Sequence, residues 1–283
     1  MIRAALAGLL ALSLPAAAET YPEARRVVSV GGSVTEIVVE LGAADRLIAR
    51  DTTSNYPESI LALPDVGYIR ALSPEGVLAL DPDLIISEEG AGPAEAVEVL
   101  RSAGIPFVEM PGAPTPEGIA EKILAVGDVL GLQDKAAELA ASVTAGLDTA
   151  KARAATVTQP KKVMFILAIQ GGQVMASGQG TEAEGIIELA GGVNAVTGFT
   201  GYKPITDEAV LTAAPDVLLM MDREGDLAIA NADVLAHPAL AQTPAAETGA
   251  IIRMDGMLML GFGPRTPQAA ADLFAALYPG LAK

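Results

Sequence analysis

The 283-residue sequence contains no cysteine and only one histidine, His237. Without cysteine the chain can form no disulfide, no thiolate metal site and no lipid-modified cysteine anchor. A single histidine also excludes a zinc or manganese site built from several imidazoles. His237 precedes Pro238 in a segment without clear periodicity. We therefore expect His237 to lie exposed in a loop and to have no ligand role.

Basic residues are scarce, because 18 Lys and Arg stand against 35 Asp and Glu, which gives a formal net charge of −17. A nucleic-acid partner would need clustered Lys and Arg, so the composition argues against one. No serine lies in a nucleophile-elbow context, and no nucleophile–base pair is recognisable. We therefore predict that the protein is not an enzyme.

Long apolar runs are also absent, since none reaches the roughly 20 residues that a transmembrane helix needs. The N-terminus instead has Arg3, a short apolar run over residues 4–14, and three alanines ending at Ala18. This layout is typical of a secretory signal peptide. We predict that residues 1–18 are cleaved after Ala18 and that the mature chain is exported to a Gram-negative periplasm.

Short apolar runs alternate with helical patterns along most of the chain, which predicts α/β layers with largely parallel sheets. Residues 135–156 differ, because they are rich in alanine, lack proline and keep one helical period. We predict an N-terminal α/β lobe over residues 19–130, a linking segment over residues 131–160 that contains one long helix, and a C-terminal α/β lobe over residues 161–283. A cleft between two such lobes is a natural site for a small molecule.

The chain repeats one motif, because residues 67–86 read GYIRALSPEGVLALDPDLII and residues 201–220 read GYKPITDEAVLTAAPDVLLM. In each copy a hydroxyl residue, Ser73 or Thr206, is placed to cap a helix. A Pro-Asp pair then ends the helix and leads into an apolar strand. This pattern of cap, helix and strand does not require a tyrosine, yet both copies begin with Gly-Tyr in a chain that has only five tyrosines.

Tyr68 and Arg70 form the leading candidate site. A free phenol has a pKa near 10, but a nearby guanidinium and a bound metal both favour the phenolate. Phenolate oxygen suits ferric iron, and tyrosine is a known axial ligand of haem. The alternative is a loop tyrosine that packs on its own lobe. Tyr202 is followed by Pro204 rather than arginine, so only the first copy can support a phenolate in this way.

Four further residues are candidates with open alternatives. Tyr202 could form a wall of the ligand site or simply pack with its hydroxyl at the edge of that site. Arg223 could pair with a ligand carboxylate or form a surface salt bridge. Glu75 and Glu208 occupy matching places in the first turns of the two repeated helices. There they could compensate the helix dipole or give each lobe one acidic contact for a basic partner.

The segments VVSVGGSVTEIVVELGAADRLIARDTTSNYP, GYIRALSPEGVLALDPDLII and LGFGPRTPQAAADLFAALYP resemble the periplasmic haem-binding proteins of bacterial haem-uptake ABC transporters. The likeness covers the predicted mature chain, and the wider group also includes siderophore and cobalamin binders. It implies two α/β lobes bridged by one long helix, ferric haem as ligand, and an inner-membrane ABC permease as partner. It also implies an outer-membrane haem receptor upstream, and we expect the protein to be a monomer.

The resemblance implies that Tyr68 is the axial ligand of the haem iron and that Arg70 supports it. It also implies that Glu75 and Glu208 dock onto arginines of the permease. Some relatives hold a second haem through a histidine where this chain has Gln170. Because glutamine is a poor haem ligand, we expect one haem, or a second one held only by stacking. The alternatives are a binder of a ferric siderophore or corrinoid and, less in keeping with the residues, a periplasmic enzyme.

Overall fold

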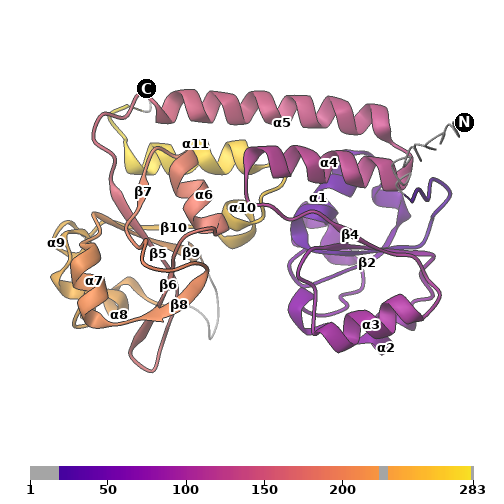
Figure 1. Cartoon of the computed structure of the whole chain (residues 1–283), viewed down its shortest axis with the longest axis horizontal. Helices are drawn as coiled ribbons and strands as arrows, with labels where there is room; N and C mark the ends of the chain where they lie inside the picture. The colour runs from indigo at the N-terminus through magenta and orange to yellow at the C-terminus, as the bar shows by residue number, and fades with distance from the viewer. Residues whose placement is uncertain (1–18, 223–228, 282–283) are drawn as a thin grey trace, which may run out of the picture.

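The computed structural model describes residues 19–222 and 229–281, which form two α/β lobes at opposite ends of the long axis (Figure 1). The predicted fold class is confirmed. One long helix, α5 (Gln133–Ala154), runs along both lobes and lies within the predicted linking segment. The lobe boundaries at residues 130 and 161 remain a prediction.

The N-terminal lobe is built on a four-stranded parallel sheet whose strand order is β2-β1-β3-β4. Its strands are β1 (Val27–Val30), β2 (Leu47–Arg50), β3 (Leu84–Glu88) and β4 (Phe107–Met110). Both faces are covered, so β1 and residues 84–87 of β3 are buried throughout and show no alternation of buried and exposed residues. One face packs on α1 (Gly32–Glu40) and α4 (Pro116–Leu130), and the other on α2 (Pro74–Leu78) and α3 (Ala94–Ser102).

The bridging helix α5 buries one narrow stripe of small and aliphatic side chains, at Ala136, Ala140, Val143, Leu147 and Ala150. Their spacing of three and four residues places them on one face of a helix. That face packs on α4 of the N-terminal lobe and on α11 (Thr266–Leu277) of the C-terminal lobe. A single stiff element therefore spans both lobes.

The C-terminal lobe contains a mixed sheet of order β10-β9-β5-β6-β8, with β7 paired to β5. Its strands are β5 (Lys162–Gln170), β6 (Gln173–Ser177), β7 (Val193–Asn194), β8 (Tyr202–Ile205), β9 (Val217–Asp222) and β10 (Ile251–Asp255). Strand β6 runs antiparallel to both of its neighbours, β5 and β8, because Gly171 and Gly172 reverse the chain after β5 with φ of 56° and 80°. The sheet is thus less parallel than the sequence pattern indicates.

The helices of this lobe are α6 (Glu182–Leu189), α7 (Asp207–Ala213), α8 (Asn231–Ala236), α9 (Pro244–Thr248), α10 (Gly256–Leu260) and α11. The predicted caps of the repeated helices are confirmed, since the Ser73 and Thr206 hydroxyls accept backbone N–H bonds from Gly76 and Ala209. No helix in residues 19–222 and 229–281 is long and apolar enough to cross a membrane.

Two other segments match helix-cap patterns in the sequence, Ser33 with Glu36 and Thr266, but neither forms a cap. The N-cap position of α1 is Gly31, and no side chain caps it. The Ser33 hydroxyl instead donates to Glu88. At the start of α11 the expected cap, Thr266, donates to the carbonyl of Gly263 and lies inside the helix. In both places the hydroxyl donates to another group and caps no backbone N–H at the start of the helix.

Two buried ionic groups connect the lobes. Arg265, just before α11, donates from both Nε and a terminal nitrogen to the carboxylate of Glu36 in α1. Lys122 of α4 is 1% exposed, and its Nζ donates to Glu88, to Ser33 and, at 3.4 Å, to the carbonyl of Phe262 in the other lobe. The arrangement of the lobes therefore depends on charged groups that are buried.

We predict that Arg265→Ala will lower the free energy of unfolding by about 3 kcal/mol at pH 8, because a buried carboxylate loses its partner. Burial raises the pKa of the Glu36 carboxyl above its ordinary value even with Arg265 opposing it. In the variant the folded state therefore holds the proton more tightly than the unfolded state, and stability falls as pH rises through that raised pKa. The deficit should shrink toward pH 4, as measured by urea unfolding over this range.

Adding Glu36→Gln to Arg265→Ala should recover part of the loss at pH 8, because the amide carries no charge. The control is Lys151→Ala, which removes an exposed pair with Glu117 at 3.5 Å and should have no measurable effect. A deficit that is equal for both ion pairs, or independent of pH, would contradict the role of the buried carboxylate.

Candidate functional site

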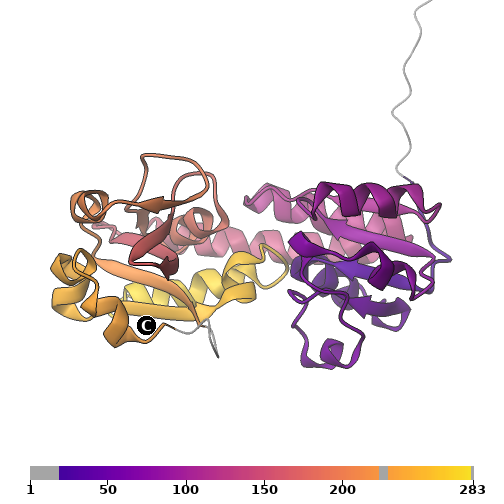
Figure 2. The ribbon, with the colours of Figure 1, turned by 90° about the horizontal axis from the view of Figure 1, so that it is seen from below.

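The carboxyl ends of the two sheets face each other between the lobes. Residues that follow β1 contact residues that follow β10: a Cβ on Gly32 would collide with the Met257 side chain, and a Cβ on Gly263 would lie 3.2 Å from Ser33. Ligands of open α/β sheets bind outside the carboxyl ends of the strands. Figures 1 and 2 show the two lobes side by side along the bridging helix α5. A ligand site is therefore expected where the carboxyl ends of the two sheets meet.

Tyr68 lies on this side of the N-terminal lobe, at the N-cap position of a short 3-10 helix over Ile69–Ala71. Its neighbours Val66, Ile69 and Leu72 are buried in the lobe core, while the Tyr68 side chain is 47% exposed. Apolar anchors therefore hold the segment down and leave the phenol in solvent. The Tyr68 ring is therefore open to contact with a ligand.

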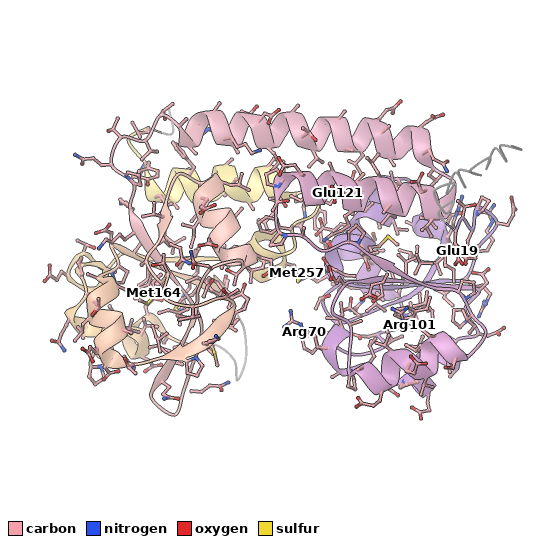
Figure 3. All side chains as sticks on the ribbon, viewed as in Figure 1. Glu19, Arg70, Arg101, Glu121, Met164 and Met257 are labelled. Carbon is pink, nitrogen blue, oxygen red and sulfur yellow. The ribbon has the colours of Figure 1, made fainter. Side chains whose placement is uncertain are left out.

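Arg70 is exposed on the same 3-10 helix. Figure 3 shows its side chain at the edge of the N-terminal lobe that faces the C-terminal lobe, with Met257 above it between the lobes. Neither the Tyr68 hydroxyl nor the Arg70 guanidinium has a side-chain hydrogen bond or ion pair within residues 19–222 and 229–281. Both are therefore available to a ligand.

Tyr202 differs from Tyr68 in its burial, its packing and the partner of its hydroxyl. It lies in β8, its ring packs edge-on against Phe165 with centroids 6.1 Å apart, and its hydroxyl donates to Glu182 at 3.0 Å. Burial raises the pKa of the Tyr202 phenol, and the Glu182 carboxylate raises it further. Tyr202 therefore stays a neutral phenol, which favours the packing alternative over a ligand role.

Gln170 ends β5 and is exposed at the β5–β6 turn. The turn is bonded to His237, whose Nε2 lies 2.9 Å from the Gly172 carbonyl. The expectation that His237 is exposed is wrong: it is 7% exposed, and its Nδ1 accepts from the backbone N–H of Ala239, which follows α8. Arg223, the remaining candidate, lies outside the described residues.

Glu75 and Glu208 are both exposed in the first turns of α2 and α7. Figure 1 shows these helices at the parts of the two lobes that lie away from α5. The pKa of the Glu75 carboxyl lies below its ordinary value, because its own backbone N–H and the Ser73 hydroxyl stabilise the carboxylate. Glu75 and Glu208 thus lie on the side of their lobes opposite the bridging helix.

Tyr56 is a residue of this region that the sequence pattern did not reveal. It is 41% exposed, and the Arg265 guanidinium lies 3.7 Å from the centre of its ring. The contact joins a loop of the N-terminal lobe to the residue that pairs with Glu36. The sequence around Arg265, GFGPRT, indicates a helix start and gives no sign of its contact with Tyr56.

Two α/β lobes joined by one long helix, with Tyr68 and Arg70 exposed on the N-terminal lobe, have the architecture of a helix-linked substrate-binding protein of an ABC transporter. Residues 27–258 match the model of the periplasmic binding protein family, and the chain belongs to that family. The N-terminal 18 residues lie outside the described part of the structure, so their cleavage remains a prediction.

Two solved structures are similar over nearly their whole length. The periplasmic haem-binding protein RhuT from Roseiflexus sp. RS-1, in apo form, is 37% identical with a TM-score of 0.86, covering 92% of this chain and 99% of that one. The periplasmic haem-binding protein BhuT in complex with two haems is 36% identical with a TM-score of 0.85, covering 90% and 98%. A vitamin B12-binding protein of Vibrio campbellii is 30% identical over 196 residues, which are 69% of this chain and 70% of that protein.

We predict that Tyr202→Phe will lower the free energy of unfolding by about 1 kcal/mol, the typical net value of one lost hydrogen bond. It should leave ligand binding unchanged, because the hydroxyl is already bonded to Glu182. Thermal unfolding and ligand titration of the same preparation check both parts. A loss of ligand affinity in this variant would instead restore Tyr202 as a wall of the site.

Proposed function

We propose that the protein captures ferric haem between its lobes and delivers it to an inner-membrane ABC permease. The observation that carries the proposal is the exposed phenol of Tyr68, anchored by buried neighbours and two residues from the unpaired Arg70. The similarity to haem-binding proteins at 36–37% identity over at least 90% of the chain supports the same ligand.

The chemistry of the pair fits ferric iron. The iron's own charge favours the phenolate of Tyr68, and a cation beside the site acts in the same direction. Phenolate oxygen is an established axial ligand of haem. Arg70 can serve in one of two ways: by stabilising the phenolate, or by pairing with a haem propionate through its planar guanidinium. Capture of this kind requires no bond-making at carbon, so we propose a carrier and not an enzyme.

One haem is the expected load. A second iron would need a second ligand, and Gln170 is a poor one, while Tyr202 is held neutral by burial and by Glu182. The complex of BhuT with two haems shows that a relative can hold more than one. In this chain a second haem would have to be held by stacking alone.

Delivery would use Glu75 and Glu208 as acidic contacts for arginines of the permease. A groove of about 630 Å³ beside Glu208, between α7 and residues 193–199, gives that side of the C-terminal lobe additional contact surface. We place the protein in the periplasm after removal of residues 1–18, downstream of an outer-membrane haem receptor, and working as a monomer.

The second candidate is a binding protein for a corrinoid, with ferric siderophores as a related possibility. The observation in its favour is the 30% identity to a vitamin B12-binding protein over two thirds of the chain. Tyr68 argues for haem iron, because a phenolate oxygen is an established axial ligand of haem.

We predict that the purified protein mixed with ferric haem will give a high-spin, tyrosinate-type absorption spectrum, and that Tyr68→Phe will abolish it. Loss of the ligand should weaken haem binding by at least the roughly 10- to 100-fold that loss of a supporting residue costs. Tyr202→Phe is the matched control and should keep both spectrum and affinity. If the wild type ignores haem and binds cobalamin, the second candidate replaces the first.

We predict that Glu75→Lys with Glu208→Lys will prevent growth of the native host on haem as sole iron source, because both acidic contacts would then repel the permease. Haem affinity of the purified variant should be unchanged. Glu121→Lys is the control for charge, since Glu121 is exposed on α4 beside the bridging helix (Figure 3). Impaired growth with the control, or lost haem binding with the double variant, would argue against a docking role.

A further inference from the structure

The chain that leads into Tyr68 extends the N-terminal sheet beyond its edge strand β2. The Arg50 N–H donates to the Pro64 carbonyl at 3.0 Å, the Val66 N–H to the Arg50 carbonyl at 2.9 Å, and the Thr52 N–H to the Gly67 carbonyl at 2.9 Å. Arg50 and Asp65 form a parallel bridge. Residues 64–67 are therefore fixed to the segment that follows β2, although they belong to no named strand.

The Asp65 carboxylate joins the two segments. Its Oδ1 accepts from the Gly67 N–H at 2.8 Å and from the Thr52 hydroxyl at 3.3 Å. Its Oδ2 accepts from the Arg50 guanidinium at 3.1 Å. The Arg50 side chain is itself 11% exposed and also donates to the Asp51 carbonyl, so it is a fixed partner. One carboxylate thus accepts from three donors around the turn that precedes Tyr68.

Gly67 makes that turn with φ of 94°, a conformation that favours glycine. A Cβ there would meet nothing closer than the Ala71 carbonyl at 3.9 Å, so the backbone conformation and not space selects glycine. Tyr68 follows in extended conformation and leads into the 3-10 helix. The Asp65 bond to the Gly67 N–H therefore holds the peptide between Val66 and Gly67, and the Thr52 N–H holds the next peptide through the Gly67 carbonyl.

The other side of Tyr68 is held by a different loop. The Gly92 N–H donates to the Ile69 carbonyl at 2.9 Å, and its carbonyl accepts from the Leu72 N–H at 2.8 Å. These bonds fix the segment after Tyr68 but not the turn before it. Of the described side chains that bond to residues 64–68, Asp65 is the one that orients the entry to Tyr68.

We propose that Asp65 is a positioning residue for Tyr68: it fixes the turn at Gly67 so that the phenol is already directed toward the space between the lobes before a ligand arrives. The proposal rests on the proposed function, in which Tyr68 binds the iron of ferric haem. A pre-organised ligand loses less conformational freedom on binding, and this gain appears as affinity. Asp65 itself touches neither iron nor porphyrin.

The test is a titration of ferric haem into Asp65→Ala, with absorption spectra. We expect affinity to fall about 10- to 100-fold, the range for residues that orient a metal's ligand, with a weaker tyrosinate band. Asp65→Asn should be intermediate, because its amide oxygen still accepts from Gly67 while the charge that pairs with Arg50 is lost. Gly67→Ala should weaken binding in the same way, through strain at positive φ.

The matched control is Asp83→Ala. The Asp83 carboxylate also accepts two backbone N–H bonds, from Arg25 at 2.8 Å and Arg26 at 2.9 Å, but at the start of β1, the opposite end of the sheet. A purely structural effect of losing such bonds would appear in both variants. Equal haem affinity for Asp65→Ala and the wild type, or an equal loss for Asp83→Ala, would overturn the proposal.

Hydrogen exchange separates this proposal from the proposed function. If the wild type binds no ferric haem, the proposed function fails, and the exchange of the Gly67 to Leu72 amides still decides the positioning. Faster exchange in Asp65→Ala than in Asp83→Ala supports a turn fixed by Asp65. Unchanged exchange in this segment shows that Asp65 does not hold it. If the wild type binds haem normally and only the Asp65 result is negative, the function stands without the positioning residue.

Discussion

The ion pair between Arg265 and Glu36 is the interaction on which the interlobe site depends. A single helix, α5, sets how far apart the lobes are, but one helix alone would let them rotate about its axis. The paired carboxylate and guanidinium remove that freedom, because separating them would leave a buried charge without a partner. Lys122 adds a second link by bonding both its own lobe and the Phe262 carbonyl of the other. Such a molecule should rock only slightly around its ligand, in contrast to proteins that close about a hinge.

The two tyrosines of the repeat show that environment, and not sequence, decides what a phenol can do. Tyr68 is exposed to solvent on a turn whose neighbours are buried, and Arg70 is exposed two residues later. Tyr202 is half-buried, packs on Phe165 and donates to a carboxylate, which holds its proton in place. The repeat therefore conserves a helix cap and a strand but not a binding group. One lobe supplies the candidate iron ligand, and in the other lobe the matching tyrosine packs against its own lobe.

Much of the fold could be predicted because it rests on local signals. The alternating apolar runs, the Ser73 and Thr206 caps and the alanine-rich segment each depend on a few neighbouring residues, and the structure has the corresponding elements. The failures involve partners distant in sequence. Ser33 and Glu36 matched a capping box, yet their side chains bond Glu88 and Arg265. His237 was expected in solvent, but the carbonyl of Gly172, from a hairpin 65 residues earlier, covers it. The antiparallel pairing of β6 with β5 and β8 was missed because the composition of a strand does not indicate the direction in which it pairs.

The candidate site divides in the same way. Tyr68 and Arg70 could be singled out because their residue types and spacing indicate a chemistry, whereas Tyr56, Asp65 and Arg265 act through contacts that only the fold creates. The exposed charges also lie on different parts of the molecule. The chain is strongly acidic, yet an unpaired arginine lies at the edge that faces the other lobe, while exposed glutamates lie on α2 and α7 away from the bridging helix. Under the proposed function, an anionic ligand and a cationic partner would be attracted to different surfaces of one protein. Salt screens exposed charges from one another beyond about 10 Å, so the two attractions act independently wherever the groups that cause them are farther apart than this.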